Sequence, residues 1–372
     1  MEDNLEISSA ENRLFASALK QNVPLNGSLE LLPLCNMNCD MCYVRLNRQE
    51  MEQQGRMRNG KEWLSVGHQM AISGTLFLLL TGGEPLLHPD FKEIYLGLKR
   101  MGFVLTINTN GTLIDEEWAD FFAKYKPRRI NITLYGSNAN DYEALCHYKQ
   151  GFEKVLNAVS LLRQRDVAVK LGSSITCSNC KQVNEMLRIA HDADVPISMD
   201  TYMMPASRER DKPFEHQSRL QPETAASVRV MAFRSEVGET AFNQYCAETL
   251  SRIDAYQNEE VAVSESSCHA GRCSFTINWQ GKMRPCVVSS EPSADVFELG
   301  FEAAWRHVSS EFQAIRYCSQ CSNCRLRPVC RTCALACLLE TGDYMGKPEY
   351  LCRYAAETER LLRIGLEEEN HE

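Results

Sequence analysis

Three cysteines near the start of the chain stand at a spacing that suits metal binding. Cys35, Cys39 and Cys42 follow the pattern Cys-x3-Cys-x2-Cys, and a tight loop with that spacing can turn three thiolates towards one point. A [4Fe–4S] cubane held by only three cysteines keeps one iron free for a further ligand. The alternatives are a zinc knuckle whose fourth ligand lies elsewhere and a chance spacing among 17 cysteines. The spacing by itself leaves these interpretations open.

A glycine-rich turn follows a buried strand further along the chain. Leu76 to Leu80 is an apolar run typical of a fully buried strand, and Thr81-Gly82-Gly83-Glu84-Pro85 ends it. Two glycines at the carboxyl end of a strand let the backbone approach a small ligand closely. Backbone carbonyls there can accept hydrogen bonds from an ammonium group, and Glu84 adds a carboxylate. On its own, such a turn is equally typical of an ordinary strand-to-helix connection.

A second set of cysteines lies in the last third of the chain. Phe275 to Pro285 reads as a hairpin with its turn at Gln280-Gly281, so these cysteines flank a hairpin and a knuckle. Such arrangements can enclose metal clusters with little regular structure, because the metal supplies the folding energy. The ten cysteines are Cys268, Cys273, Cys286, Cys318, Cys321, Cys324, Cys330, Cys333, Cys337 and Cys352.

The composition argues against several classes of protein. The chain has 372 residues, 44% of them hydrophobic, which suffices for one large domain and a smaller one. A net charge of −9 argues against a broad nucleic-acid surface. Residues 1–20 hold four acidic side chains and no apolar run, so they are no signal peptide, and no stretch approaches the roughly 20 apolar residues of a membrane span. We therefore expect a cytoplasmic protein whose cysteines bind metal.

Six predicted strands alternate with helices ahead of the cysteine-rich region. This alternation predicts an α/β fold with a parallel sheet. Ligands of such folds sit at the carboxyl ends of the strands, where the cysteine loop, Gly82-Gly83-Glu84 and Thr109-Asn110 all fall. The expected strands are Ser28–Leu34, Leu76–Leu80, Phe103–Thr109, Arg129–Tyr135, Val167–Thr176 and Ile197–Met203.

Together, the three-cysteine loop and the Gly-Gly-Glu turn resemble the radical S-adenosylmethionine (SAM) enzymes. The resemblance implies a partial (β/α)6 TIM-like barrel in which Cys35, Cys39 and Cys42 hold a [4Fe–4S] cluster whose free iron is chelated by SAM. An electron from the cluster then cleaves SAM to methionine and a 5′-deoxyadenosyl radical. The Ser-Leu-Asp-Gly of many relatives is Thr133-Leu134-Tyr135-Gly136 here, and an often aromatic position is Met41. The implied cofactor-binding residues are Met41, Gly82, Gly83, Glu84, Thr109, Asn110, Thr133 and Ser173, with Ser174 as the alternative to Ser173.

The cysteine-rich region resembles the SPASM extension of radical SAM enzymes, which implies two auxiliary [4Fe–4S] clusters and three clusters in total. Its pattern expects a cysteine at position 334, which is alanine here. By resemblance, the first auxiliary cluster takes Cys268, Cys273, Cys286 and either Cys333 or Cys337. The second takes Cys321, Cys324, Cys330 and Cys352. Two zinc sites are the alternative.

Four parts are expected along the chain. They are an N-terminal helix and loop at 1–27, the radical SAM partial barrel at 28–220, a helical linker at 221–265, and a SPASM domain with a C-terminal helix at 266–372. A charged stretch at 204–220 is expected to be a solvated connection or a lid.

Enzymes with this extension mostly modify peptides or proteins, so we expect a maturase that abstracts hydrogen from a ribosomally made peptide and forms a thioether or carbon–carbon crosslink. The alternatives are an anaerobic sulfatase maturase, which forms formylglycine, and a non-catalytic iron–sulfur carrier or scaffold. The expected partners are a precursor peptide or protein substrate and a flavodoxin- or ferredoxin-type electron donor, but no nucleic acid and no membrane. The substrate is expected to be recognised either by a separate leader-recognition protein or directly by the barrel and the extension. Asp200 and Tyr202, which end the sixth strand, are candidates for proton removal by position alone.

Overall fold

Nine strands form one sheet in this computed structural model, which describes residues 9–204, 218–256 and 268–369. The strand order is β6-β5-β4-β3-β2-β1-β7-β8-β9. Most of the expected lid or connection at 204–220, and the end of the expected linker at 257–265, lie outside the described residues. The strands are β1 (Asn26–Glu30), β2 (Phe77–Thr81), β3 (Val104–Thr109), β4 (Arg129–Thr133), β5 (Val169–Ser174), β6 (Ile197–Asp200), β7 (Ser274–Ile277), β8 (Lys282–Arg284) and β9 (Ala294–Asp295).

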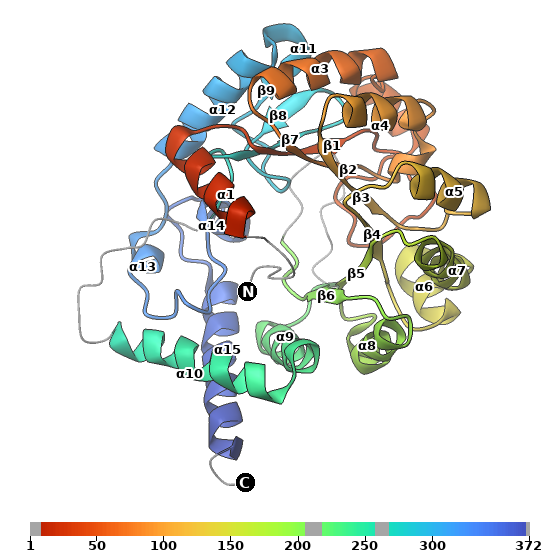
Figure 1. The fold of residues 1–372 in the computed structure, drawn as a ribbon. Coiled ribbons are helices and arrows are strands. Elements are labelled where there is room, and N and C mark those ends of the chain that lie inside the picture. Colours follow the sequence, from red (N-terminus) through yellow and green to blue (C-terminus); the bar gives the residue numbers. More distant parts are fainter. Residues whose placement is uncertain (1–8, 205–217, 257–267, 370–372) are drawn as a thin grey trace.

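Strands β1 to β6 pair in parallel, each with the next along the chain. This confirms the predicted α/β fold with a six-stranded parallel partial barrel. Figure 1 shows the curved sheet with α3, α4, α5, α7 and α8 outside it. Several strands are shorter than expected because residues beyond their carboxyl ends turn away as loops. Residues 31–34, for example, continue from β1 towards the cysteine loop.

Helices form most of the connections between the strands. Two of them begin at capping boxes, in which Asn47 pairs with Glu50 and Asn59 with Glu62. The sequence analysis did not predict α2 and α6 in the barrel region, nor α11 to α14 in the C-terminal region. The helices are α1 (Ser9–Gln21), α2 (Arg48–Gln54), α3 (Gly60–Ile72), α4 (Phe91–Arg100), α5 (Glu116–Lys124), α6 (Ala139–Cys146), α7 (Gly151–Gln164), α8 (Val183–Asp192), α9 (Pro222–Val237), α10 (Glu239–Ala255), α11 (Val296–Leu299), α12 (Phe301–Ala314), α13 (Ser319–Ser322), α14 (Ala334–Thr341) and α15 (Glu349–Glu369).

The cysteine-rich third continues the barrel sheet instead of standing apart from it. Strand β7 pairs in parallel with β1, and β8 returns antiparallel to β7. The predicted hairpin is therefore present, with its turn at Gly281 (φ 96°), where glycine avoids the strain of a left-handed backbone. Helix α15 then packs against α9 and α10. The region contains more regular structure than the sequence led us to expect.

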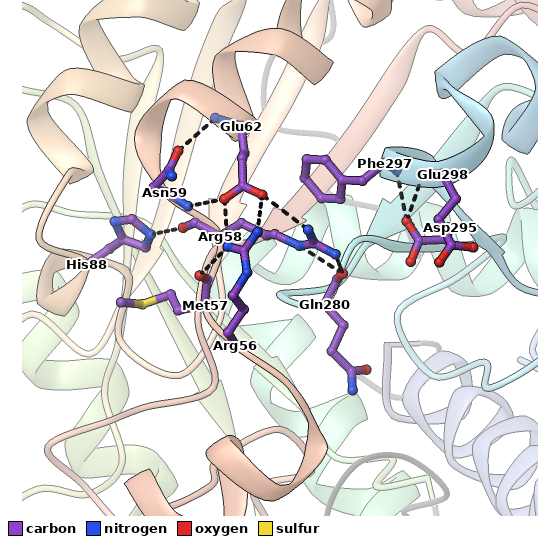
Figure 2. Close-up of polar contacts among 10 residues, drawn as sticks. All are labelled: Arg56, Met57, Arg58, Asn59, Glu62, His88, Gln280, Asp295, Phe297 and Glu298. Atoms are coloured by element: carbon purple, nitrogen blue, oxygen red, sulfur yellow. Dashed lines mark hydrogen bonds and ion pairs between the residues drawn. The ribbon is translucent and has the colours of Figure 1, made fainter.

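Arg58 connects the tip of the β7–β8 hairpin to the barrel through hydrogen bonds. Its guanidinium donates to the carbonyl oxygen of Gln280 from Nη2 (3.0 Å) and Nε (3.3 Å), as Figure 2 shows. Glu62 holds Arg58 in place through an ion pair of 3.1 Å. Next to this contact, the buried Trp279 packs with Leu46 and Met51. The hairpin that leads to Cys286 is thus docked against the segment that follows the three-cysteine loop.

None of the helices among the described residues combines the length and the apolar character that a membrane crossing requires.

The join between β1 and β7 supplies a stability test. A Cβ atom on Gly27 would lie 2.4 Å from Cζ of Phe275, whose buried ring packs against Phe301. We expect Gly27→Ala to lower the free energy of unfolding by about 1–3 kcal/mol, because overpacking forces the two strands apart. Adding Phe275→Leu should recover part of this loss. Urea unfolding followed by circular dichroism measures both.

Gly172→Ala is the matched control, since an added Cβ on that β5 glycine meets nothing within 4 Å. Equal losses for Gly27→Ala and Gly172→Ala would contradict the tight β1–β7 contact.

Candidate active site

The loop from Cys35 to Cys42 lies at the carboxyl end of the sheet and is hydrogen-bonded to the end of α6. The backbone N–H groups of Asn38 and Asp40 donate to the carbonyl oxygens of Cys146 and Leu145, both at 3.1 Å. These carbonyls stand at the end of α6, where a helix has no backbone donors of its own left to satisfy them. The otherwise irregular loop is thereby held in one conformation.

All three loop cysteines are free thiols, and each sulfur has a hydrogen-bond donor. Cys35 Sγ accepts from the backbone N–H of Met37 (3.4 Å) and from Asn110 Nδ2 (3.6 Å). Cys42 Sγ accepts from the backbone N–H of Arg45 (3.3 Å). Cys39 is hydrogen-bonded by the side chains of Cys146 and Tyr135, which lower its pKa. Donors of this kind stabilise thiolates, the form in which cysteine binds metal.

Burial has the opposite effect on Cys35. It raises the pKa of this thiol to about 12, and the nearby Glu84 and cysteine charges add to the rise. A metal must therefore displace a proton from Cys35 when it binds.

The loop forms one wall of a cavity of about 300 Å³. The opposite walls come from the ends of β2, β3, β4 and β5, as expected for a ligand site in a parallel sheet. Three thiols and several polar strand ends on one cavity fit a three-cysteine cluster together with a small polar ligand. The lining residues are Cys35, Met37, Cys39, Met41, Cys42, Tyr43, Val44, Arg45, Thr81, Gly82, Gly83, Asn108, Thr109, Asn110, Thr133, Tyr135, Ser174 and Met203.

Gly82 and Gly83 are needed because this turn packs directly on the segment that leads to Cys35. A Cβ on Gly82 (φ 138°) would lie 2.4 Å from the oxygen of Leu32, and one on Gly83 would lie 2.3 Å from the oxygen of Leu34. The sequence analysis ascribed the glycines to a close approach of the ligand. Both glycines do line the cavity, but the clearest reason for glycine at these two positions is the close contact between the two backbone segments.

Glu84 is fully buried and does not line the cavity. Its carboxylate accepts hydrogen bonds from the hydroxyl of Thr109 (2.8 Å) and from the backbone N–H groups of Asn110 (2.8 Å) and Leu86 (3.1 Å). Burial raises the pKa of Glu84 to about 7, and these three donors oppose the rise. Glu84 thus ties the end of β3, including the Asn110 that contacts Cys35, to the glycine turn.

The two serines that end β5 point to different sides. Ser174 lines the cavity, whereas Ser173 is buried and donates from Oγ to Sδ of Met186 on α8 (3.7 Å). Successive side chains of a strand alternate between its two faces, so only one of the two serines can face the ligand. Of the two serines considered, the structure favours Ser174 for the cavity.

Asp200 and Tyr202 lie at the contact between the barrel and the C-terminal region. Asp200 pairs with Arg331 at 3.2 Å, and the hydroxyl of Tyr202 donates to Glu340 on α14 at 2.7 Å. Glu340 is also ion-paired with the buried Arg219. Burial raises the pKa of Tyr202. Neither proposed proton acceptor lines the cavity, where Met203 is the nearest contribution from this segment.

The C-terminal cysteines fall into neighbouring groups. Burial raises the pKa of Cys286 to about 11, and the charges of Cys268 and Cys333 add to the rise. The charge of Cys268 also acts on Cys273 and Cys333, so these four thiols lie near one another.

A second group surrounds Cys321. Cys318, Cys321 and Cys337 form a buried cluster, while the charges of Cys330 and Cys324 act on Cys352, and Cys352 in turn acts on Cys321. Within the described ranges, no three histidine, cysteine or carboxylate side chains lie close enough to share a single metal ion.

Two residues beside the loop were not singled out from the sequence. Cys146 was not among the predicted metal ligands, and Tyr135 was noted only as a departure from a family pattern. The sequence held a signal for Tyr135 alone. It stands two residues after Thr133 and therefore faces the same side of the chain as the chain leaves β4.

The comparisons with known proteins agree with this geometry. The sequence model of the radical SAM superfamily matches residues 29–180. The AdoMet-dependent heme synthase of Methanosarcina barkeri is 22% identical over 90% of this chain and 97% of that protein. The antilisterial bacteriocin subtilosin biosynthesis protein AlbA of Bacillus subtilis is 22% identical over 84% of this chain and 68% of its own length.

Among solved structures, Streptococcus suis SuiB bound to its precursor peptide SuiA superposes with a TM-score of 0.65. It is 16% identical, and the match covers 95% of this chain and 83% of that one. This likeness supports the fold of both the barrel and the C-terminal region. Residues 29–180 therefore form a radical SAM domain, and the cysteine-rich C-terminal region fits the SPASM-type extension found among the peptide-modifying relatives of this chain.

Proposed function

We propose that this enzyme matures a ribosomally synthesised peptide by abstracting hydrogen from it, so that a thioether or carbon–carbon crosslink forms. The observation that carries the proposal is the sharing of one cavity by three free thiols, the Gly82-Gly83 turn and the polar ends of three further strands. The peptide substrate is supported by the similarity to AlbA and by the fold shared with SuiB, whose structure holds a precursor peptide.

The radical SAM family binds SAM and a [4Fe–4S] cluster. In this chain, Cys35, Cys39 and Cys42 are the proposed cluster ligands. When bound, the cluster would supply the electron that cleaves SAM to methionine and the 5′-deoxyadenosyl radical, which takes hydrogen from the substrate.

The residues of the chain hold the cluster, SAM and the substrate in fixed positions relative to one another and exclude water from the cavity. The proposed SAM contacts are Met41, Gly82, Gly83, Thr109, Asn110, Thr133 and Ser174, all of which line the cavity.

Two auxiliary [4Fe–4S] clusters are proposed for the C-terminal region, where they would transfer electrons and stabilise the fold. The mutual effects of Cys268, Cys273, Cys286 and Cys333 support these four as the first ligand set. The charges of Cys324 and Cys330 act on Cys352, and that of Cys352 acts on Cys321. These effects support the four cysteines as the second ligand set.

A second candidate is a non-peptide substrate. The match to the M. barkeri heme synthase spans nearly the whole of both chains, so overall length and architecture do not separate the two classes. An anaerobic sulfatase maturase is the third possibility, since this family includes structural relatives of that kind.

Product analysis distinguishes these functions. The reconstituted, reduced enzyme is incubated with SAM and with a candidate precursor peptide, a sulfatase peptide or an iron porphyrin precursor of heme. We expect loss of two hydrogens from the precursor peptide, with crosslinked fragments in tandem mass spectrometry. Formylglycine in the sulfatase peptide, or conversion of the porphyrin to heme, would contradict the maturase proposal.

Replacing the three loop cysteines tests the SAM site. We expect the triple variant Cys35→Ala, Cys39→Ala, Cys42→Ala to form no 5′-deoxyadenosine on reduction, because no other site has an open iron. It should keep roughly two-thirds of the iron. Chromatography of the products and iron analysis measure these quantities. Cys177→Ala, at an exposed cysteine outside the cavity, is the control and should resemble the wild type. Continued 5′-deoxyadenosine formation by the triple variant would move the catalytic site elsewhere.

Metal analysis tests the auxiliary clusters. Anaerobically reconstituted protein should hold about 12 irons and a matching amount of sulfide per chain, the content of three cubanes. Stoichiometric zinc, or only about four irons, would defeat the auxiliary-cluster assignment.

Cys333 and Cys337 should differ in their effect on iron content. Cys333 is the one that lies with Cys268 and Cys286, while Cys337 packs with Cys318 and Cys321. We expect Cys333→Ala to lower iron by up to about four atoms per chain and to destabilise the C-terminal third, and Cys337→Ala to keep its iron. Iron analysis with a thermal melt decides this. The reverse pattern would reassign the ligand to Cys337.

A further inference from the structure

A second, smaller cavity lies among the helices that support the C-terminal region. Helix α15 packs against α9 and α10, and Figure 1 shows these three helices together. The cavity has a volume of about 60 Å³, enough for a few water molecules or one small ion. Its wall includes Arg229 and Phe233 from α9, Tyr245 from α10, Tyr354 from α15 and Arg331 from the loop before α14. We call it the α9 cavity. It is lined by two arginines and by no carboxylate.

Arg229 is a buried cation whose charge has little compensation. The residue is only 9% exposed. Its Nη1 donates one long hydrogen bond to the carbonyl oxygen of Met199 on β6 (3.4 Å), and its guanidinium carbon lies 5.9 Å from the centre of the Phe233 ring. Its Nε is buried without a hydrogen-bond partner, and Arg229 forms no ion pair with any residue that the structure describes. Because arginine stays protonated in proteins, such burial is unfavourable unless an anion is supplied.

A neighbouring arginine shows how the fold compensates a buried charge elsewhere. Arg219, shortly before α9, is also buried and is ion-paired with Glu340. Arg331, which is partly exposed, pairs with Asp200 at 3.2 Å. Both guanidinium groups therefore have a carboxylate partner from the protein itself. At Arg229 the fold supplies a cavity in the place of a carboxylate.

The α9 cavity is separate from the proposed cluster sites. Cys330 lines it, but the thiol of Cys330 is hydrogen-bonded to the hydroxyl of Thr332 (2.9 Å). The other three proposed ligands of that cluster, Cys321, Cys324 and Cys352, do not line the cavity. A cluster held by all four cysteines would therefore lie outside it.

We propose that the α9 cavity binds a small oxyanion of the phosphate or sulfate kind. The planar guanidinium of Arg229 can donate two parallel hydrogen bonds to such an anion from the edge that carries Nε, and charge-assisted pairs of this geometry are strong. Arg331 adds a second positive charge and Tyr354 a hydroxyl group to the same wall. The volume admits a single group of this size, so the ligand is the free ion. The inference is independent of the proposed function.

The test uses the full-length reconstituted protein in a buffer that contains neither phosphate nor sulfate. Its melting temperature is followed while inorganic phosphate, sulfate or chloride is added at matched ionic strength. We expect phosphate and sulfate to raise the melting temperature of the wild type along a saturable curve, because a ligand that binds the folded state stabilises it by mass action. Chloride should have much less effect. Isothermal titration calorimetry with phosphate should show a single site.

Arg229→Met removes the charge and keeps an extended side chain. In the phosphate-free buffer we expect this variant to melt no lower than the wild type, since it takes an uncompensated charge out of the interior. Its affinity for phosphate should fall at least about tenfold, because hydrogen bonds to a charged group are lost. Arg234→Met on the same helix is the matched control and should respond as the wild type does. Arg234 pairs with Glu239 and does not line the cavity.

Each outcome decides the inference. A wild type without a saturable response to phosphate or sulfate would overturn it, because the cavity would then hold water alone. Equal phosphate affinity in the wild type and Arg229→Met would also overturn it and would leave an adventitious ion only, bound elsewhere. If Arg229→Met does not fold, Arg331→Gln at the more exposed arginine decides. Weaker phosphate binding by that variant supports the site, and unchanged binding overturns it.

Discussion

The close approach of two backbone segments is the constraint on which the site depends. The turn at Gly82-Gly83 lies so near residues 32–34 that a single added carbon on either glycine would collide with a carbonyl oxygen. Hydrogen bonds from Gly83 to Leu32 (2.8 Å) and from Glu84 to Leu34 (2.9 Å) fasten the two segments together. Because Cys35 follows directly, the position of the first thiol is set by this contact. Glycine is required here for space as well as for conformation.

Around that contact, the protein surrounds an irregular loop with regular elements. Glu84 bridges the glycine turn to the end of β3, and Asn110 from that end reaches the sulfur of Cys35. On the other side, the last carbonyls of α6 hold the loop backbone. A loop held from both sides presents its thiols without needing metal to order every bond, and this preorganisation favours a well-defined site.

The C-terminal region is joined to the barrel through its backbone and through buried charges. Strand β7 extends the barrel sheet beside β1, and Arg58 holds the hairpin tip at Gln280. At the far edge, Arg219 and Glu340 form a buried ion pair beside Tyr202. A buried pair of this kind is costly to break, because each charge would be left without its partner. The two cysteine-bearing regions are therefore held at a set separation.

The sequence by itself determined the types of chemistry and the order of the strands. The spacing of Cys35, Cys39 and Cys42 and the alternation of apolar runs are local patterns, and they led to the correct fold class and to residues that line the cavity. Which of Ser173 and Ser174 faces that cavity depended on the register of β5, which a run of small polar residues leaves open. The contact of Tyr135 and Cys146 with Cys39, and the pairing of β7 with β1, join residues far apart in the chain. Only the tertiary structure could decide these, because no local pattern encodes a contact that packing alone brings about.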